Sequence, residues 1–407
     1  MVPDDSVQNS CSELAVVIPA YLEGDINFCL DSLFVNQGFA FQAIIIVVLN
    51  HSADAPEETK KFHRSQAEAL KEQYTRLSPV IQFHVIEAEW PAKMAGVGMA
   101  RKIGLDYASA LFHEKNYPQG ILVCLDADTV VPVNYLSILH TAFRKHKLNA
   151  ATIYFEHQLD TANQAAIVDY ELHLRLYING QRLAGYPLAF QTVGSAMACT
   201  AEAYNKQGGM VKKKAGEDFY FMQKLMPLGC LADLVDTKVM PSSRESDRVP
   251  FGTGRAVKQH KRLGIQLTYH PESYLYFQDL VSFLDNLALG PDNFNAFNGL
   301  SPHIRDFLEQ IDFIKTVTSI YQQASSREAL RKRLYNWFNP FMVMKYFHHM
   351  RSEGFSDRPI QEVLHTLMHL HGLDFCQDRF ECLTVLRLQD RARPRYLTPG
   401  YRLITLV

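Results

Sequence analysis

Two aspartates, Asp126 and Asp128, follow the apolar segment 121–125, and their type and spacing suit metal chemistry. The apolar run is short and partly β-branched, as in a buried parallel strand. Ligands of parallel α/β sheets bind beyond the carboxyl ends of the strands, where this strand would deliver both carboxylates. Carboxylates this close repel each other unless a cation or protons intervene, and hard divalent cations prefer oxygen ligands. We therefore predict a Mg²⁺ or Mn²⁺ site that holds a phosphorylated substrate. A solvated pair of aspartates at a strand end is the alternative.

Apolar strands and amphipathic helices alternate on either side of this segment. That alternation predicts βαβ units and an α/β fold with a mostly parallel mixed central sheet flanked by helices. The further strands are expected at 14–18, 43–49, 80–86, 151–155, 191–200 and 234–240, the fifth being either a strand or a close-packed loop. Helices are expected at 25–35, 56–77, 97–111, 136–143, 161–183 and 219–226.

The β signals fade after about residue 255, and the remaining sequence shows helical patterns broken by proline and glycine. We expect a core domain over residues 1–265 and a mainly helical C-terminal region over 266–407. The aromatic stretch 337–347 suits either a helix packed in the core or peripheral contact with a membrane.

Composition restricts the class of protein. The 407 residues are 47% hydrophobic and 21% charged, which is enough apolar sequence for a large core. The 41 basic and 43 acidic residues nearly cancel, which argues against a nucleic-acid partner held by bulk charge. Seven scattered cysteines without a C-x-x-C pair are typical of reduced thiols and predict a cytoplasmic protein. No apolar run reaches the ~18 residues of a transmembrane helix, so none is expected.

Five segments in order resemble motifs of the family 2 glycosyltransferases, which have the GT-A nucleotide-binding fold. They are V-V-I-P-A-Y-L-E-G at 16–24, L-N-H-S-A-D at 49–54, G-V-G-M-A-R-K-I-G at 96–104, D-A-D at 126–128, and the pair V-G-S-A and G-E-D at 193–196 and 216–218. Each motif is weak alone, but the five together are specific. The match covers about residues 13–240, and the family's Q-x-x-R-W motif is missing. At the second motif, Leu49 and Asn50 replace the acid pair whose second member contacts the base, so a preference for uracil does not carry over.

The resemblance implies an inverting, metal-dependent glycosyltransferase that moves a sugar from a nucleotide-sugar donor to a hydroxyl of a glycan or other acceptor, in glycan or cell-envelope polysaccharide synthesis. It implies Asp126 at the ribose and metal, Asp128 as a direct metal ligand, and Asp218 as the general base with Glu217 orienting or capping. Capping of a helix by both acids is the alternative. The residues implied at the donor nucleotide are Pro19, Ala20, Tyr21, Glu23, Asn50 and Arg101. Arg248 lies with other arginines on a glycine-bearing segment, which suits a clamp that closes over the donor diphosphate. Tyr21 could instead be a core aromatic, Arg101 could pair with a neighbouring acid, and Arg248 could lie on a solvated loop.

Two other functions fit parts of the sequence. The segment 126–131 also matches the D-x-D-x-[T/V] strand of haloacid dehalogenase-like phosphatases, in which Asp126 would be a covalent nucleophile. That motif normally sits on the first strand, whereas three strands are predicted before it here. The other alternative is a sugar-nucleotide-binding protein that has lost its activity, which the intact Asp128 and Asp218 disfavour.

Overall fold

The computed structural model describes residues 12–159, 162–213, 215–245, 252–370, 372–373 and 376–405. The chain divides into two compact units. The first comprises residues 1–158, 192–242 and 248–251, and the second comprises 159–191, 243–247 and 252–407. A domain boundary near residue 265 stays a prediction.

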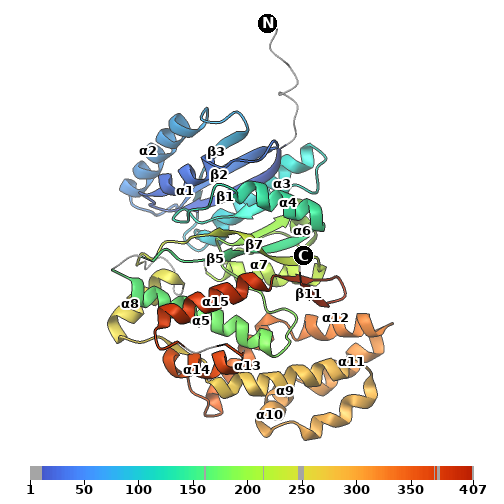
Figure 1. Ribbon diagram of the computed structural model, residues 1–407. Coiled ribbons are helices and arrows are strands. Elements are labelled where there is room, and N and C mark those ends of the chain that lie inside the picture. The colour runs from blue at the N-terminus through green and yellow to red at the C-terminus, as the bar shows by residue number, and fades with distance from the viewer. Residues whose placement is uncertain are drawn as a thin grey trace. The chain divides into compact units, whose positions relative to one another are not determined.

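The first unit is built on a sheet of seven strands, β1 to β7, of which Figure 1 labels β1, β2, β3, β5 and β7. Their spatial order is β7-β5-β6-β4-β1-β2-β3. The strands β1 to β4 are mutually parallel, β6 is antiparallel to both β4 and β5, and β5 and β7 are parallel. Their bounds are β1 Ser12–Ala20, β2 Gln42–Ser52, β3 Ile81–Trp90, β4 Ile121–Cys124, β5 Ala150–Phe155, β6 Met197–Thr200 and β7 Leu231–Val239.

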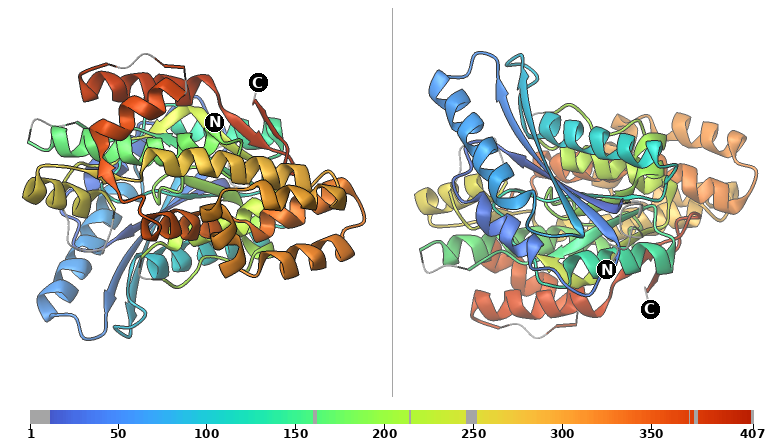
Figure 2. Two further views of the ribbon diagram at one scale, coloured as in Figure 1. Left: turned by 90° about the horizontal axis from the view of Figure 1, so that it is seen from below. Right: turned by 90° about the horizontal axis from the view of Figure 1, so that it is seen from above.

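The helices of the first unit cover both faces of the sheet (Figure 2). The chain builds β1, β2 and β3 outward in one direction and then returns to place β4 on the other side of β1. Because parallel crossovers are right-handed, this reversal puts α3 on the face opposite α1 and α2. The bounds are α1 Ile26–Phe34, α2 Glu57–Tyr74, α3 Val97–Glu114, α4 Tyr135–His146, α6 Ala201–Lys206 and α7 Glu217–Leu225.

The second unit is mainly helical. Its helices are α5 Gln164–Leu183, α8 Thr253–Leu263, α9 Pro271–Leu287, α10 Pro302–Gln310, α11 Phe313–Gln323, α12 Arg327–Trp337, α13 Pro340–Ser352, α14 Ile360–Leu370 and α15 Arg379–Ala392. Two short antiparallel pairs accompany them, namely β8 Leu267–Thr268 with β9 Arg358–Pro359 and β10 Arg395–Leu397 with β11 Leu403–Thr405. The predicted α/β class, with a mostly parallel sheet and a helical C-terminal region, is confirmed.

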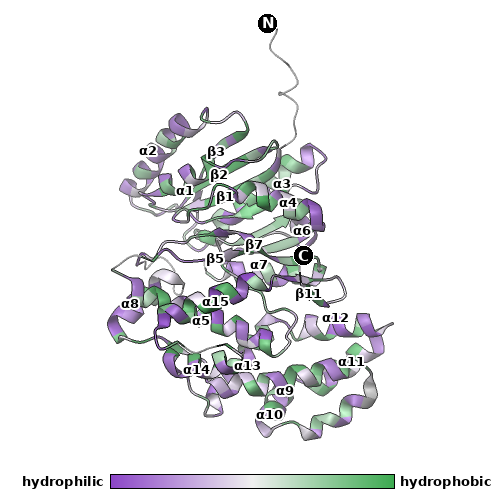
Figure 3. Ribbon diagram, in the orientation of Figure 1, coloured by the Kyte–Doolittle hydropathy of each residue, from purple (hydrophilic) through white to green (hydrophobic). Residues whose placement is uncertain are grey.

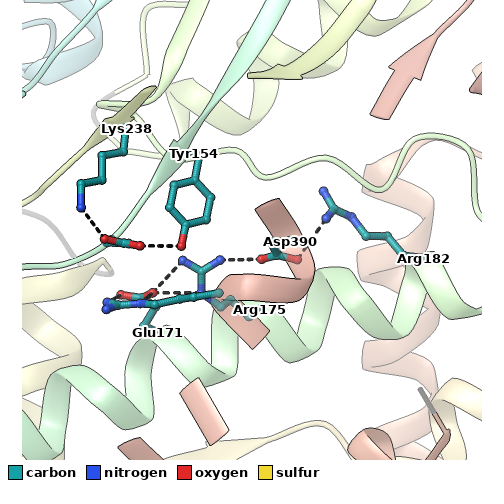
Figure 4. Close-up of polar contacts among 8 residues, drawn as sticks. Tyr154, Glu171, Arg175, Arg182, Lys238 and Asp390 are labelled. Carbon is teal, nitrogen blue, oxygen red and sulfur yellow. Dashed lines mark hydrogen bonds and ion pairs between the residues drawn. The ribbon is translucent and has the colours of Figure 1, made fainter. Parts of the chain in front are cut away.

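Buried charges join α5 to α15 inside the second unit (Figure 4). Arg175 of α5 lies between Glu171, at 2.7 Å, and Asp390 of α15, at 2.5 Å. Arg182 also reaches Asp390, and Arg387 binds Glu171 through both carboxylate oxygens at 2.7 Å. Because every charge in this buried group has a partner of opposite sign, the group fixes the register of the two helices rather than forming an open site.

The aromatic stretch 337–347 packs inside the second unit. Phe338, Val343, Tyr346 and Phe347 are all fully buried. The tyrosine hydroxyl donates to the carbonyl oxygen of Ser273 at 2.9 Å. Of the two interpretations of this stretch, the core helix is therefore correct and the membrane-surface one is wrong. Among the described residues, no helix combines the length and the apolar character needed to cross a bilayer.

Candidate active site

The D-A-D segment is a turn held in place at both ends. The N–H of Leu125 donates to the carbonyl of Val17 in β1 at 3.1 Å, which continues the β1–β4 pairing past the end of β4. Beyond the turn, Val130 exchanges hydrogen bonds with Met240 at 3.2 and 2.9 Å. The N–H of Thr129 closes the turn on the carbonyl of Asp126 at 3.0 Å. Both carboxylates therefore project from a fixed backbone at the end of a buried strand.

Strand order locates a binding crevice at this turn. Because β1 lies between β2 and β4, the chain leaves the carboxyl ends of β1 and β4 in opposite directions, and the connecting loops separate there. The loop after β1 and the D-A-D turn after β4 therefore flank the same topological switch point. Ligands of open α/β sheets bind at such points.

The end of β1 and the loop after it hold four of the residues implied at the donor nucleotide. Pro19 and Ala20 are the buried last residues of β1, and the Glu23 side chain is buried as well. Tyr21 is 41% exposed and makes an edge contact with the His63 ring at a centroid distance of 5.7 Å. The interpretation of Tyr21 as a core aromatic is therefore wrong, because its ring stands at the surface beside the switch point.

Two side chains of α2 hold this loop. The N–H of Leu22 donates to Nε2 of His63 at 3.2 Å, and Nε2 of Gln66 donates to the carbonyl of Glu23 at 2.5 Å. Leu22 has a φ of 51°, a left-handed conformation that is uncommon for a non-glycine residue. The two hydrogen bonds stabilise that conformation and fix where Tyr21 is presented.

The protonation of the histidines follows from these contacts. Because Nε2 of His63 accepts from Leu22, the proton of the neutral ring sits on Nδ1, which lies 3.0 Å from Nδ1 of His51. Nδ1 of His51 accepts the hydrogen bond from this N–H, and Nε2 of His51 lies 3.5 Å from Oε2 of Glu89. Burial and the neighbouring His51 lower the pKa of His63 to about 4, so the ring stays neutral near pH 7.

Asn50 is a buried residue near the end of β2. Its Nδ2 donates to the carbonyl of Gly96, the residue before α3, at 3.1 Å. Its Oδ1 is buried and has no hydrogen-bond partner among the described residues. A buried unpartnered acceptor is costly, so this oxygen is a candidate for a hydrogen bond from a ligand.

The glycines of the third motif let α3 pack at two places. A Cβ on Gly104 would meet Val17 of β1 at 2.3 Å, and one on Gly98 would meet the carbonyl oxygen of Lys213 at 2.1 Å. The helix therefore lies close against β1 on one side and against the segment that leads into α7 on the other. Arg101 lies between these two contacts on the same helix.

Arg101 is 3% exposed and binds two carboxylates. Its guanidinium pairs with Asp126 through Nη2 and with Glu217, the first residue of α7, through Nη1. Burial alone would lower the pKa of Arg101, but the charges of both acids raise it, so the guanidinium stays charged. Gly194 makes room for it, because a Cβ there would lie 2.5 Å from a guanidinium nitrogen. The sequence left open whether Arg101 contacts the diphosphate or pairs with an acidic side chain, and in the structure it pairs with two acids.

Asp218 follows Glu217 in the first turn of α7, after Gly216 in the left-handed conformation. Its Oδ1 accepts from the N–H of Phe219 at 2.7 Å. Burial and the adjacent charge of Glu217 raise the pKa of Asp218 to about 6, although Arg101 acts to lower it. A carboxylate with that pKa is ionised at neutral pH and is a stronger base than an ordinary aspartate.

The acids also define what cation the site could hold. Among the described residues, no group of three or more His, Cys, Asp or Glu side chains is placed to bind a metal by itself. Asp126 already shares one oxygen with Arg101, while its side chain is 36% exposed. Mg²⁺ is commonly bound by one or two carboxylates together with substrate phosphates, and the D-A-D turn fits a site of that kind.

Sequence reasoning missed the supporting residues His63, Gln66 and Gly194. His63 continues the buried face of α2 formed by Thr59, Ala67 and Leu70, a helical spacing that could have distinguished it from the solvated charges. Gly194 carries no signal beyond its place in V-G-S-A. Arg248 lies outside the described residues.

Comparisons with known proteins give structural likenesses only. No protein-family model matches the chain, and no curated protein matches it. Among solved structures, it is similar to residues 1–349 of S. aureus TarS in complex with UDP-GlcNAc, at 14% identity over 90% of this chain and 94% of that one, with a TM-score of 0.42. It is also similar to GalNAc-T7 with UDP, GalNAc and Mn²⁺, at 15% identity over 78% and 59% of the two chains, with a TM-score of 0.38. Likenesses at this level carry no argument about activity.

Proposed function

We propose that the chain is a GT-A type glycosyltransferase that moves a sugar from a nucleotide sugar to an acceptor hydroxyl. One observation carries this proposal. Arg101 binds Asp126 of the D-A-D turn with one nitrogen and Glu217 of the E-D pair with another. Two acidic motifs from separate parts of the sequence therefore converge on one buried guanidinium. A transferase needs such convergence, because the group that holds the donor and the base that activates the acceptor must act on the same anomeric carbon.

The donor nucleotide would lie at the switch point between β1 and β4. Tyr21 presents an exposed ring for stacking on the base, while His63 and Gln66 hold its loop. With Nδ2 of Asn50 engaged by Gly96, its Oδ1 is the atom left to accept a hydrogen bond. That acceptor suits a base edge with an N–H, such as the imide of uracil, better than the N3 acceptor of cytosine.

The D-A-D turn would hold the donor diphosphate through a divalent cation. Asp128, assisted by Asp126, would provide carboxylate oxygens, and diphosphate oxygens would complete the shell. When bound, Mg²⁺ or Mn²⁺ stabilises the negative charge that develops on the departing nucleoside diphosphate. Arg101 fixes Asp126 and offsets part of the negative charge of the acidic side chains at this site.

Asp218 would act on the acceptor side. Its carboxylate would take the proton of the acceptor hydroxyl as the oxygen attacks the anomeric carbon, while the bond to the diphosphate breaks on the opposite side. Such a displacement inverts the anomeric configuration. Glu217 is bound to Arg101, so it orients the start of α7 and keeps the pKa of Asp218 raised.

Metal-dependent binding tests the donor half of the proposal. We expect UDP to bind much more tightly with Mn²⁺ than with EDTA, because the carboxylates at the D-A-D turn would otherwise repel the diphosphate. Asp128→Ala should abolish the difference, and calorimetry on the folded variant measures it. Equal affinities of the unaltered chain with and without metal would refute the metal site.

Product analysis separates the transferase from the phosphatase. We expect slow hydrolysis of a nucleotide sugar to free sugar and nucleoside diphosphate, without release of inorganic phosphate from small phosphoesters. The structure disfavours a nucleophilic role for Asp126, since three strands of the sheet precede β4 and Arg101 binds its carboxylate. Mass-spectrometric detection of an aspartyl-phosphate at Asp126 would overturn the proposal. Binding without any turnover would instead indicate an inactive sugar-nucleotide-binding protein.

A further inference from the structure

The segment 253–268 of the second unit is strongly basic. It contains two arginines, two lysines and a histidine but no acidic residue. Arg255, Lys258 and Arg262 are exposed and are spaced at i, i+3 and i+7 on α8, so they share one face of that helix. Figure 3 shows α8 as mostly hydrophilic, and Val257 is its one fully buried side chain. The helix is anchored by a narrow inner face and presents a cationic outer face.

Exposed aliphatic side chains follow directly on this helix. Leu263, Ile265 and Leu267 are 47%, 46% and 39% exposed, although they lie within five residues of one another. Gly264, in the left-handed conformation, ends α8 and turns the chain into this segment. Single exposed aliphatics are ordinary at protein surfaces, whereas three together beside a cationic stripe indicate an interaction surface.

The neighbouring charges leave the surface positive. Lys261 pairs with Glu245 at 2.5 Å, and His260 turns to Asp169 of α5 at 2.9 Å. Arg255 and Arg262 form no ion pair among the described residues. On the adjoining strand β9, the exposed Arg358 lies opposite Thr268 of β8, and the nearby Asp357 is bound by Arg351.

We propose that α8 and the segment 263–267 form a docking surface for an anionic lipid bilayer. Peripheral binding commonly needs two weak signals, and this surface has both. Arg255 and Arg262 would meet acidic headgroups, while Leu263, Ile265 and Leu267 would enter the interface between headgroups and acyl chains. An acidic protein would match the charge but would not require the three aliphatic side chains.

Vesicle sedimentation with the full chain tests this surface. We expect binding to vesicles of phosphatidylcholine mixed with phosphatidylglycerol and little binding to phosphatidylcholine alone. Binding should weaken as salt rises, because the charge attraction is screened within about 8 Å at physiological ionic strength. Arg255→Gln/Arg262→Gln should lower the partition coefficient by roughly fivefold for each charge removed. Leu263→Ser/Ile265→Ser should lower it by about tenfold while leaving some salt-sensitive binding.

The matched control is Ile314→Ser/Lys315→Gln on α11, where an exposed isoleucine and an exposed lysine are adjacent in the same unit. This control should bind the mixed vesicles as the unaltered chain does. Every altered side chain is exposed, and unchanged thermal unfolding would show that each variant folds. Equal binding of the unaltered chain to both vesicle types, or unchanged binding of both α8 variants, would overturn the proposal. The proposal would also be overturned if light scattering showed the unaltered chain as a dimer and the α8 variants as monomers, because the surface would then join two copies of the chain.

Discussion

Replacing Asp218 with asparagine is expected to lower kcat for sugar transfer by about 10²- to 10⁴-fold, or roughly 3 to 5 kcal/mol. Asparagine keeps the shape and can still accept the hydrogen bond from the N–H of Phe219. It cannot take the proton of an acceptor hydroxyl. Metal-dependent binding of the nucleoside diphosphate should change little, because the proposed metal ligands lie on the D-A-D turn. Steady-state kinetics together with calorimetry would separate the two effects.

The pH profile gives a second test of the same role. Since the pKa of Asp218 is raised to about 6, the carboxylate becomes protonated as pH falls through that value and can no longer act as a base. We expect kcat/KM of the unaltered chain to fall below about pH 6. The residual activity of Asp218→Asn should lack this acidic limb.

Glu202→Gln is the matched control. Glu202 is also an acid in the first turn of a helix, and it hydrogen-bonds Gln119 away from the cluster around Arg101. Near-normal turnover of Asp218→Asn, or a loss of nucleotide binding as large as that of Asp128→Ala, would rule out the base role.

The sheet and the position of the D-A-D turn were predictable because apolar periodicity reports burial directly. Six strands were expected from short apolar runs, and all six are present in the first unit; of the segment 191–200, expected as a strand or a close-packed loop, Met197–Thr200 forms β6. The carboxylates at the end of β4 could be placed at the binding edge because that edge is a property of parallel sheets. The resemblance added α7 and its acids, which no periodicity would have joined to the turn.

The contacts that hold the site could not be predicted, because they depend on which elements become neighbours in space. From the sequence alone, Arg101 could equally contact the donor diphosphate or pair with an acidic side chain. Only the structure shows that Asp126 and Glu217 both lie beside it. His63 lies on a helix most of whose charged residues are exposed, and its partner Leu22 is distant in sequence. The helix α5 groups with the later helices through buried charges on α15, a pairing that sequence order hides.

Removing the Arg101 guanidinium is expected to have the largest effect on stability. Arg101→Leu fills much of the same space but leaves Glu217, which is buried, without its cation. Breaking a buried ion pair by removing one partner costs about 3 to 5 kcal/mol, because an uncompensated charge stays in the interior. Asp126 contributes less to that cost, since its side chain is 36% exposed and water can solvate it. Urea denaturation of the variant and the unaltered chain measures the loss of unfolding free energy.

Two further variants show whether buried charge is the cause. Arg144→Leu removes an arginine that is 51% exposed and bound to Glu13, and it should cost less than about 1 kcal/mol, as surface pairs usually do. Arg101→Leu/Glu217→Gln should recover a large part of the stability lost by Arg101→Leu, because the stranded charge is then absent. If the double variant were less stable than Arg101→Leu by the full cost of a separate Glu217→Gln variant, the two side chains would not be coupled. Arg101 would then support the site through packing against Gly194 and β1. Its ion pair with Glu217 would contribute nothing measurable to the free energy of unfolding.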